Sequence, residues 1–540
     1  DSLNTVSHAP KGVILVIPPW NFPLAIPVGG VAASLAAGNT VILKPATVAL
    51  PVAWEFAKCF WEAGVPKDAL QVVCTADRSS LGYLGAHPAI KHIILTGGTD
   101  TAFRLLENSP RTPLSAETGG KNAIIVTSSA DQDHAILNAV SSAFSNAGQK
   151  CSACSLLFVD KKRFNDESFK SKLKDAVTSL RTGSVWDTMN YVGPMIDNNN
   201  EKLKYAIEHL EAGESWLVAP EFVDESKYIL KPTVKYGVKP GSYTFKTELF
   251  APLLSVVCID DLKQGIKFAN SSEYGLTAGL QSLNEAEQKL WKSAIKAGNL
   301  YINRGITGAI VRRQPFGGMK RSAFGGGIKA GGPNYVSCLV QFTENKITKA
   351  PSSNYFSDLV EDRDERIRFD FGYLNFPHVW RKEMSQERDF CYVDGEENIF
   401  RYLPLGNIGF RVADSDNLAD VLIVIIAAHT VKTAIGISLS SSNPNIQAIE
   451  KFAFSHSKST LTVIVQDEDA FIADMNKYER IRACSTGLSD ALYQEAAKLG
   501  KYVADSKPSI EGRLELLHYL KEQSVSYEYH RYGSVFDDER

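Results

Sequence analysis

Short runs of β-branched and aliphatic residues alternate with amphipathic segments over the first 126 residues of this 540-residue chain. Strands are predicted at 12–17, 40–43, 70–73 and 92–95, with helices between them at about 25–37, 48–63 and 99–108. Strands that alternate with helices form a parallel α/β sheet, in which ligands bind at the carboxyl ends of the strands. The alternation therefore predicts both the fold class and the edge of the sheet where a site should lie.

Further α/β regions are predicted beyond this sheet. Residues 122–302 continue in mixed α/β style, and the glycine-rich stretch 315–333 is predicted to be a loop. The composition changes around 347–407, where a charge run at 361–368 is expected to form a solvated helix face. From residue 407 a second alternation begins, with strands predicted at 408–412, 434–439 and 461–465 and helices near 417–430, 445–455 and 468–482. It predicts a smaller Rossmann-like module that closes with a helix at 512–520 and an aromatic tail.

The composition argues against two classes of partner. A net charge of -3 provides no basic surface of the kind that binds nucleic acid or anionic membranes. Hydrophobic and charged contents of 44% and 22% are ordinary for a soluble globular protein with a large core. The longest strongly apolar stretch, residues 421–428, is too short to span a bilayer and is predicted to be a buried helix. We therefore expect no nucleic-acid partner and no membrane insertion.

The eight cysteines are scattered without the spacing of a disulfide scaffold, which favours a reducing compartment. No signal peptide is visible, and we expect a cytoplasmic protein. Cys151 and Cys154 form a lone CxxC, but zinc would need a second ligand pair, and none stands at suitable spacing. We therefore expect no metal site, and a redox role for this pair is the weaker alternative.

Glu117 and Cys151 are the strongest candidates for chemistry. Cys151 is flanked by small and polar residues at 146–152, so its thiol is predicted to be available for reaction. Glu117 ends a short strand and precedes Gly119 and Gly120, where a carboxylate is a plausible base. Together they predict covalent catalysis through a thio-intermediate that a Glu-activated water later resolves.

Three other positions follow predicted strands, and each has a purely structural alternative. Asn21 lies in a proline-framed turn and is either a rigid turn residue or an oxyanion-hole donor. Lys44 is either a surface lysine or a partner for ribose hydroxyls. Gly97 and Gly98 open a predicted helix, where small residues let a pyrophosphate approach the backbone amides. The chain has no GxGxxG fingerprint, so a conventional dinucleotide site is not indicated.

The segment 247–252 places Glu248 close to Phe250. The carboxylate could hold a ribose, and the ring could pack against a nicotinamide. The alternative is an exposed loop acid beside a core phenylalanine.

In their order and separations, these motifs resemble the aldehyde dehydrogenase superfamily from the first strand through about Lys346. The resemblance implies NAD as cofactor and a fold made of a Rossmann-like cofactor domain and an α/β catalytic domain, followed here by a smaller Rossmann-like domain. It implies that Cys151 is the nucleophile, Glu117 the base and Asn21 the oxyanion donor. The cofactor-binding residues that it implies are Ile17, Pro18, Trp20, Lys44, Gly97, Gly98, Glu248 and Phe250.

The stretches 148–155, 306–310, 314–318 and 329–335 look like the L-glutamate γ-semialdehyde (Δ1-pyrroline-5-carboxylate) dehydrogenase family. This resemblance implies oxidation of that aldehyde to L-glutamate in proline catabolism. It assigns the small-molecule substrate to Phe22, Ser152, Gly308 and Ala309, and a hydroxyl with backbone N–H groups suits the substrate's α-carboxylate.

The module from about residue 395 resembles the extra C-terminal domain of long proline utilization A proteins, and its motifs have no counterpart of the Glu117–Cys151 pair. We therefore expect it to be non-catalytic. The resemblance also implies a homo-oligomer and a proline dehydrogenase partner, either fused or separate. The family usually has Glu where this chain has Thr47, and NAD remains the expected cofactor over NADP.

The expected domains are an N-terminally truncated NAD-binding domain (1–120), a catalytic domain (121–319), a return to the cofactor domain with an oligomerisation strand (320–349), a linker (350–406) and a non-catalytic C-terminal domain (407–540). Three alternatives stay open at this point. One is a non-catalytic assembly protein of two dehydrogenase-like modules, and another is a different aldehyde specificity. The third is a cysteine hydrolase without NAD, which would need a histidine partner, and no recognisable motif surrounds His134.

Overall fold

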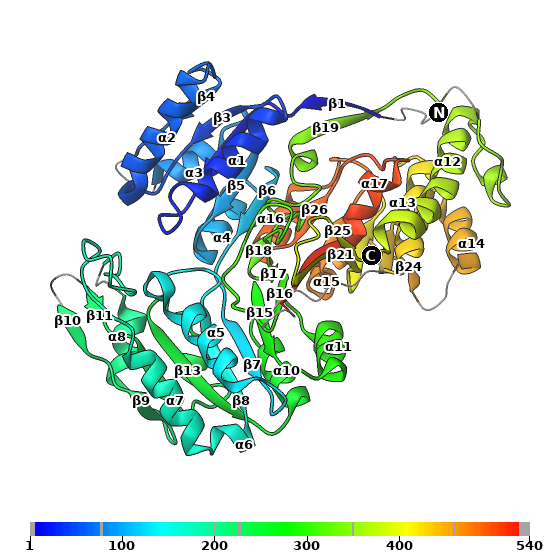
Figure 1. Ribbon diagram of the computed structural model, residues 1–540. Helices are drawn as coiled ribbons and strands as arrows, with labels where there is room; N and C mark the ends of the chain where they lie inside the picture. The colour runs from blue at the N-terminus through cyan, green and yellow to red at the C-terminus, as the bar shows by residue number, and fades with distance from the viewer. Residues whose placement is uncertain are drawn as a thin grey trace.

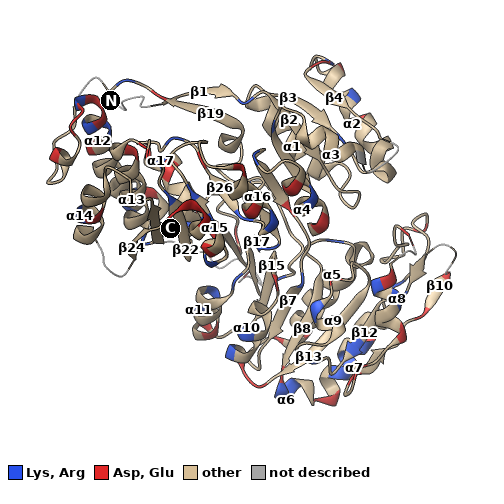
Figure 2. Ribbon diagram, turned by 180° about the vertical axis from the view of Figure 1, so that it is seen from behind, with Lys and Arg blue, Asp and Glu red and all other residues tan. Residues whose placement is uncertain are grey.

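Three α/β regions make up the computed structural model, which describes residues 6–75, 79–197, 200–224, 226, 228–347, 350–456 and 460–528. Figure 1 shows them as a blue N-terminal region, a cyan and green central region and a yellow to red C-terminal region. Acidic and basic residues are interspersed along the outer helices, and most of the strands are free of charge (Figure 2). The interspersed signs agree with the small net charge of the chain.

The N-terminal region is a six-stranded sheet in the order β18-β6-β5-β2-β3-β4, parallel except for β18. Its strands are β2 (Val13–Ile17), β3 (Thr40–Leu43), β4 (Leu70–Val72), β5 (Ile90–Thr96), β6 (Leu114–Glu117) and β18 (Ala323–Phe324). Its helices are α1 (Ala25–Ala36), α2 (Leu50–Glu62), α3 (Ser79–Ala86) and α4 (Thr99–Asn108). The predicted parallel sheet is confirmed, and its strand bounds differ from the prediction by two residues at most.

The central region is a ten-stranded sheet in the order β20-β21-β27-β16-β15-β7-β8-β13-β12-β9. The strands from the first half of the chain are β7 (Asn122–Val126), β8 (Cys154–Asp160), β9 (Ser215–Val218), β12 (Thr233–Tyr236) and β13 (Leu253–Ile259). The later ones are β15 (Thr277–Gln281), β16 (Asn299–Ile302), β20 (Arg388–Asp389), β21 (Glu396–Pro404) and β27 (Leu520–Glu528). The helices of this region are α5 (Gln132–Phe144), α6 (Lys161–Phe164), α7 (Glu167–Thr178), α8 (Glu201–Glu208), α9 (Tyr243–Lys246), α10 (Leu262–Asn270) and α11 (Glu285–Ala294). Every residue of β7 and β15 is buried, as expected for parallel strands with both faces covered.

Two-stranded pieces complete the N-terminal and central regions. Two of them are β10 (Phe222–Asp224) with β11 (Ile229–Leu230), and β14 (Tyr274–Gly275) with β17 (Met319–Lys320). The third is an antiparallel ribbon of β1 (Val6–Pro10) and β19 (Val340–Glu344) that extends from the N-terminal region toward the C-terminal one (Figure 1).

The C-terminal region is a five-stranded parallel sheet in the order β24-β23-β22-β25-β26. Its strands are β22 (Asn407–Arg411), β23 (Ala434–Leu439), β24 (Leu461–Val465), β25 (Arg480–Arg482) and β26 (Tyr502–Ala504). Its helices are α12 (Arg363–Val379), α13 (Leu418–Val431), α14 (Ile446–His456), α15 (Glu468–Asp474), α16 (Asp490–Lys498) and α17 (Gly512–Glu515). The apolar stretch 421–428 lies wholly inside α13 and is buried all round, as predicted.

Three details of the C-terminal region differ from the prediction. The helix expected at 468–482 ends at Asp474, and Arg480–Arg482 form a strand because they pair with β22 and β26. Residues 520–528 are the strand β27 and not an aromatic tail, since they pair with β16 on one side and β21 on the other. The charge run on α12 is only partly solvated, because Arg368 is half-buried and forms ion pairs with Glu344 on β19 and Asp420 on α13.

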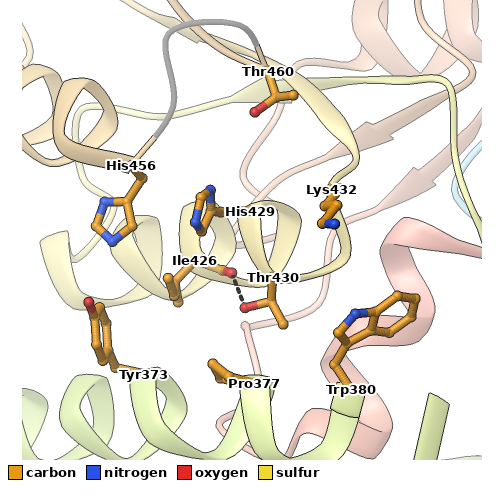
Figure 3. A pocket seen from close by; sticks show the side chains of 9 residues that line it. All are labelled: Tyr373, Pro377, Trp380, Ile426, His429, Thr430, Lys432, His456 and Thr460. Carbon is orange, nitrogen blue, oxygen red and sulfur yellow. Dashed lines mark hydrogen bonds between the residues drawn. The ribbon is translucent and has the colours of Figure 1, made fainter. Parts of the chain in front are cut away.

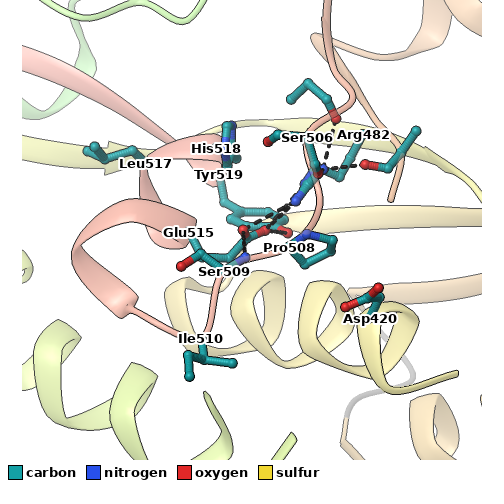
Figure 4. A network of polar contacts seen from close by, with 12 residues as sticks. Asp420, Arg482, Ser506, Pro508, Ser509, Ile510, Glu515, Leu517, His518 and Tyr519 are labelled. Atoms are coloured by element: carbon teal, nitrogen blue, oxygen red, sulfur yellow. Dashed lines mark hydrogen bonds and ion pairs between the residues drawn. The ribbon is translucent and has the colours of Figure 1, made fainter. Parts of the chain in front are cut away.

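A buried ion pair fastens the end of the C-terminal module to its sheet (Figure 4). Arg482 on β25 pairs with Glu515 on α17 at 2.9 Å, and both side chains are almost fully buried. The same guanidinium donates to the carbonyl oxygens of Ala504 and Ser506, and the Tyr519 hydroxyl donates to Glu515 at 2.7 Å. These bonds hold α17 in place immediately before the chain enters β27.

Candidate active site

A cavity of about 820 Å³ lies where the carboxyl ends of β2, β5 and β6 meet the loop that carries Cys151. Parallel strands end at the same edge of their sheet, so residues distant in sequence converge there. Seven of the predicted site residues line this cavity: Ile17, Pro18, Phe22, Glu117, Cys151, Ser152 and Ala309. The predicted nucleophile, base and part of the substrate loop therefore share one space.

The loop before Cys151 has an unusual backbone. Asn146, Ala147 and Gly148 are three consecutive residues with positive φ, at 56°, 53° and 67°. A Cβ at Gly148 would lie 2.4 Å from the carbonyl oxygen of Ala251, so only glycine fits there. Left-handed residues of this kind persist only where surrounding contacts hold them, and they cluster at functional sites.

Asn122, at the start of β7, supplies such contacts. Its amide nitrogen donates to the carbonyl oxygens of Cys151 at 2.7 Å and Ala153 at 3.0 Å, and its amide oxygen accepts from the Thr277 N–H. No local pattern in the sequence marks Asn122, although it directly follows the glycine-rich motif at 116–121. It fixes the Cys151 backbone against the central sheet.

Asn21 lies against the same loop from the N-terminal region. Its amide nitrogen donates to the carbonyl oxygen of Gln149 at 3.0 Å, two residues before Cys151. The structure therefore places a side-chain N–H donor beside the nucleophile loop. Its role as an oxyanion donor stays a prediction.

Glu117 is the last residue of β6, and glycine backbone surrounds its carboxylate. The Gly318 N–H donates to Oε2 at 2.8 Å, and a Cβ at Gly317 would lie 2.9 Å from Oε1. Burial raises the pKa of Glu117, while the buried ammonium of Lys329 and the Gly318 N–H oppose that rise. A carboxylate held in this way is a stronger base than one in water.

The Cys151 thiol is held neutral in the folded chain. Burial raises its pKa to about 12, and the negative charges of Glu117 and Glu248 act in the same direction. The N–H groups of Ser152 and of Cys151 itself only partly offset this effect. Reaction at neutral pH therefore requires a group that takes the thiol proton, and the Glu117 carboxylate faces it.

Glu248 lies on the glycine pair that follows Glu117. The Gly120 N–H donates to its Oε1 at 2.7 Å, and a Cβ at Gly119 would lie 2.3 Å from its Oε2. Phe250 has a φ of 53°, and its ring meets Trp20 edge to face with centroids 5.8 Å apart. The alternative of an exposed loop acid is therefore wrong: Glu248 is half-buried, and its charge raises the pKa of the nucleophile.

Gly97, Gly98 and Lys44 lie at the ends of neighbouring strands. The Gly97 N–H donates to the Glu117 carbonyl at 3.1 Å, and Lys44 directly follows β3. Gly98 is the residue before α4, and a Cβ there would meet nothing within 4 Å, so its backbone is open to approach. The other predicted site residues lie outside the lining of the cavity: Asn21, Trp20, Lys44, Gly97, Gly98, Glu248, Phe250 and Gly308.

Hydrogen bonds and an ion pair hold the predicted substrate loop, which contains Gly308 and Ala309. The Tyr301 hydroxyl donates to the Gly308 carbonyl oxygen, and Ala309 lines the cavity. Arg304 near the start of the loop pairs with Glu396 on β21 at 3.1 Å and donates to the Ser526 hydroxyl on β27 at 2.7 Å. Two strands from far along the chain therefore support the loop.

The cavity wall fits a dinucleotide. Small residues of α1 line it beside the strand ends, so that backbone is accessible there; they are Ala25, Gly29, Gly30, Ala32, Ala33 and Ala36. The Thr96 and Glu117 ends of β5 and β6 open into the same space. Strand ends with small residues and an adjacent helix suit a pyrophosphate and its sugars, even without a GxGxxG sequence.

A second cavity, of about 550 Å³, lies among α12, α13 and α14 in the C-terminal region (Figure 3). His429, His456 and Lys432 contribute its titratable nitrogen groups, and Tyr373 and Trp380 contribute aromatic rings. Its lining, within the described residues, contains neither a thiol nor a carboxylate. It therefore lacks the pair of groups that the first cavity brings together.

In the described parts of the chain, no three or more His, Cys, Asp or Glu side chains gather closely enough to hold a metal ion. A search of the same residues finds no helix with the length and apolar character needed to cross a membrane. All eight cysteines belong to the described residues and are free thiols.

Comparison with known proteins places the chain in a family. The model of the Aldehyde dehydrogenase family matches residues 1–345. The 1-pyrroline-5-carboxylate dehydrogenase of Geobacillus sp. (strain WCH70) is 36% identical over 349 residues, which are 63% of this chain and 67% of that protein. A second relative, 1-pyrroline-5-carboxylate dehydrogenase 2 of Bacillus subtilis (strain 168), is 35% identical over the same share of each chain.

Solved structures are similar as well. Proline utilization A from Corynebacterium freiburgense has a TM-score of 0.85 and 36% identity, and the match covers 99% of this chain and 52% of that one. The chain thus spans about half the length of that protein. The 1-pyrroline-5-carboxylate dehydrogenase from Thermus with bound NAD has a TM-score of 0.59 and 32% identity over 63% of this chain and 67% of the other. The chain therefore belongs to the aldehyde dehydrogenase family.

Proposed function

We propose that this chain oxidises L-glutamate γ-semialdehyde, the open form of Δ1-pyrroline-5-carboxylate, to L-glutamate with NAD. One observation carries the proposal: a single cavity holds the thiol of Cys151, the carboxylate of Glu117 and, beside them, Ser152 and Ala309. The names of the relatives, 1-pyrroline-5-carboxylate dehydrogenases, support this substrate. The Thermus relative with bound NAD supports the cofactor.

The chemistry begins at Cys151. Glu117 takes the thiol proton, and the sulfur forms a bond to the aldehyde carbon. The negative charge that develops on the aldehyde oxygen is stabilised by N–H donors, for which Asn21 and the Cys151 backbone N–H are the candidates. The Ser152 hydroxyl and the backbone at Gly308 and Ala309 hold the substrate's α-carboxylate, so the aldehyde end points at the thiol.

NAD, when bound, supplies the two-electron acceptor that converts the Cys151 adduct into a thioester. The residues proposed to hold it are Ile17, Pro18, Trp20, Lys44, Gly97, Gly98, Glu248 and Phe250. The strand ends and the small residues of α1 support this assignment, because they leave backbone groups accessible beside Glu117. Although Thr47 stands where the family usually has Glu, NAD is proposed over NADP, and the Thermus relative with bound NAD supports this choice.

Glu117 first gives the thiol proton to solvent and then acts on water. Its carboxylate removes a proton while the water oxygen adds to the thioester carbon, and cleavage of the carbon–sulfur bond releases glutamate and the Cys151 thiolate. The pKa of Glu117, raised by burial, suits this role because a stronger base removes the proton more readily.

The test is Cys151→Ala, assayed by NADH absorbance with glutamate semialdehyde and with a short aliphatic aldehyde as the comparison substrate. We expect oxidation to fall to background, because the bond to sulfur cannot form, while NAD binding measured by calorimetry persists. Unchanged turnover would reject the assignment of Cys151. Equal turnover of the aliphatic aldehyde by the unaltered chain would reject the substrate.

Several finer points belong to the same proposal. We propose the domain boundaries 1–120, 121–319, 320–349, 350–406 and 407–540, with the last domain non-catalytic. We also propose a cytoplasmic homo-oligomer. The similarity to proline utilization A supports a proline dehydrogenase, fused or separate, as the source of the substrate.

A further inference from the structure

Strand β27 presents three polar side chains on one face, and each bonds to a different loop of the active site. Alternate residues of a strand share a face, so Glu522, Ser524 and Ser526 point the same way. All three are at most 3% exposed. Ser524 donates to the Pro315 carbonyl at 2.6 Å, and Ser526 accepts from Arg304 at 2.7 Å.

Glu522 has the most consequential contacts of the three. Its Oε2 accepts from the backbone N–H of Lys329 at 2.7 Å, and its Oε1 accepts from the Asn334 amide nitrogen at 2.7 Å. The carboxylate therefore fastens both ends of the loop 329–334. A buried carboxylate with two N–H partners holds such a loop more firmly than a neutral acceptor does.

Lys329 transmits this position to the base. Its ammonium donates to Asn299 at 2.9 Å and to the carbonyl oxygen of Gly317. The next N–H along the chain, that of Gly318, is the one that donates to Glu117. The Gly317–Gly318 peptide is therefore held at its oxygen by Lys329 and bonded at its nitrogen to the base.

We infer that Glu522, on the last described strand, is a positioning residue for Glu117 and acts through Lys329 and the Gly317–Gly318 peptide. The inference rests on the proposed function, in which Glu117 activates the water that cleaves the thioester. It goes beyond that function because it assigns the geometry of the base to a strand of the C-terminal segment.

The charges of Glu522, Lys329 and Glu117 predict the direction in which the pKa of Glu117 moves when Glu522 is replaced. The charge of Glu117 acts on Cys151, Lys329 and Tyr335. That of Lys329 acts on Glu117 and Glu522. That of Glu522 acts on Lys329, Tyr402 and Cys338. The carboxylate of Glu522 favours the charged ammonium of Lys329, which in turn favours the ionised Glu117. Removing the charge of Glu522 therefore lets Lys329 lose its proton more easily, and Glu117 then ionises only at higher pH.

The experiment compares Glu522→Gln with the unaltered chain in rapid-mixing and steady-state assays of NADH formation. We expect a burst of NADH whose amplitude is unchanged, because Cys151 is intact, and whose rate is lower, because Glu117 also takes the thiol proton. The steady-state rate should fall on the order of tenfold, and up to the ~100-fold that a 1 Å misplacement can cost. The acid limb of the steady-state rate should move to higher pH.

The matched control is Lys521→Gln, the neighbouring residue on the same strand. Its side chain points away and pairs with Glu479 at 2.8 Å on the partly exposed side. We expect its burst, its steady-state rate and its acid limb to match those of the unaltered chain. A general effect of disturbing β27 would change both variants alike and would reject the inference.

A loss of burst amplitude in proportion to the steady-state rate in Glu522→Gln, or an unmoved acid limb, would also overturn the inference. If Glu522→Gln does not fold, Asn334→Ala is the second variant, because it removes one of the two hydrogen bonds to the Glu522 carboxylate. We expect it to lower the steady-state rate and shift the acid limb in the same directions, by smaller amounts. The rate of Cys151 alkylation by iodoacetamide against pH needs neither cofactor nor turnover. The pH at which this alkylation rate rises depends on Glu117, and it should be higher in Glu522→Gln than in the unaltered chain. This holds even if the unaltered chain forms no NADH. A lack of NADH would reject the proposed function and leave the inference about Glu522 standing.

Discussion

Glu117 and Cys151 both bind their protons more tightly in the folded chain than in water. Burial is the largest cause for each, and the two groups also face one another. The thiol remains the weaker acid of the two, since the pKa of Cys151 is raised to about 12 and that of Glu117 to about 8, so the thiol gives up its proton only as the carbon–sulfur bond forms. Lys329 and the Gly318 N–H keep Glu117 from becoming neutral altogether.

The raised pKa of Glu117 predicts a particular pH dependence. The base works only when ionised, so the steady-state rate should rise with pH through a pKa above the ordinary range of carboxyl groups. Rates measured at saturating substrate and cofactor from pH 5 to 9, with NADH absorbance as the signal, check this. Glu117→Gln should lose this limb and should also slow the NADH burst, because the same carboxylate takes the thiol proton. A rate already at its plateau at pH 5 would contradict the prediction.

At the residue scale, the sequence predicted the positions whose motifs are local. Cys151, Ser152 and Glu117 lie in short glycine-rich stretches that match a family, and the shared edge of a parallel sheet explains why they converge in one cavity. Lys329 also lies in a matched stretch, but nothing local marks it as a partner of Glu117. Asn122 and Tyr301 went unassigned for the same reason, since their roles depend on loops that only the fold brings near.

At the element scale, the apolar strands could be predicted and the polar strand could not. β2, β3, β23 and β24 are runs of aliphatic residues, and their observed bounds lie close to the predicted ones. β27 is as buried as these strands, yet its core positions hold Glu522, Gln523, Ser524 and Ser526. Their hydrogen-bond partners come from distant loops, so no apolar periodicity marks the strand in the sequence.

The pair of Arg482 and Glu515 predicts a large stability effect in the C-terminal module. Both side chains are almost fully buried, so Glu515→Gln leaves a buried guanidinium without its counter-charge and should cost about 3–5 kcal/mol of unfolding free energy. Urea unfolding followed by circular dichroism measures the loss. Replacing both partners together, as Arg482→Met with Glu515→Leu, should cost less than the single change, and an equal cost would contradict this account.

The same pair predicts how that stability depends on pH. The ion pair with Arg482 lowers the pKa of Glu515 against the opposing effect of burial. A carboxyl group whose pKa is lower in the folded state stabilises the fold above its unfolded pKa of about 4.3. The contribution is lost as pH falls below that value and through the folded pKa, so acid should weaken the C-terminal module in the unaltered chain.

At the scale of the whole molecule, the C-terminal segment is part of the central sheet as well as of its own module. β21 and β27 extend the central sheet beyond β16, and Arg368 on α12 binds Glu344 at the end of the β1–β19 ribbon. The module's own sheet begins in sequence with β22, whose first residue is Asn407. The sequence could not show the pairing of β27 with β16, because strand partners far apart in the chain leave no local pattern.

This pairing predicts the result of a truncation. A chain that stops after Tyr519 lacks β27, so β16 and β21 are left with open edges and the loops at 315–318 and 329–334 lose their anchors. We expect aldehyde oxidation to fall to background and size-exclusion chromatography to show aggregation. The unaltered chain under the same conditions is the control, and an active, monodisperse truncated chain would contradict the prediction.

The place of β27 in the sheet also has a consequence for biosynthesis. Gln523 on β27 donates to the carbonyl of Ala297, a residue 226 positions earlier in the chain. A ribosome that adds about 5–20 residues per second takes on the order of 10–45 s to cover that interval. During that time the edge of β16 that pairs with β27 has no strand partner. Because β27 is translated long after β16, the base Glu117 reaches its final geometry only after that strand has been synthesised.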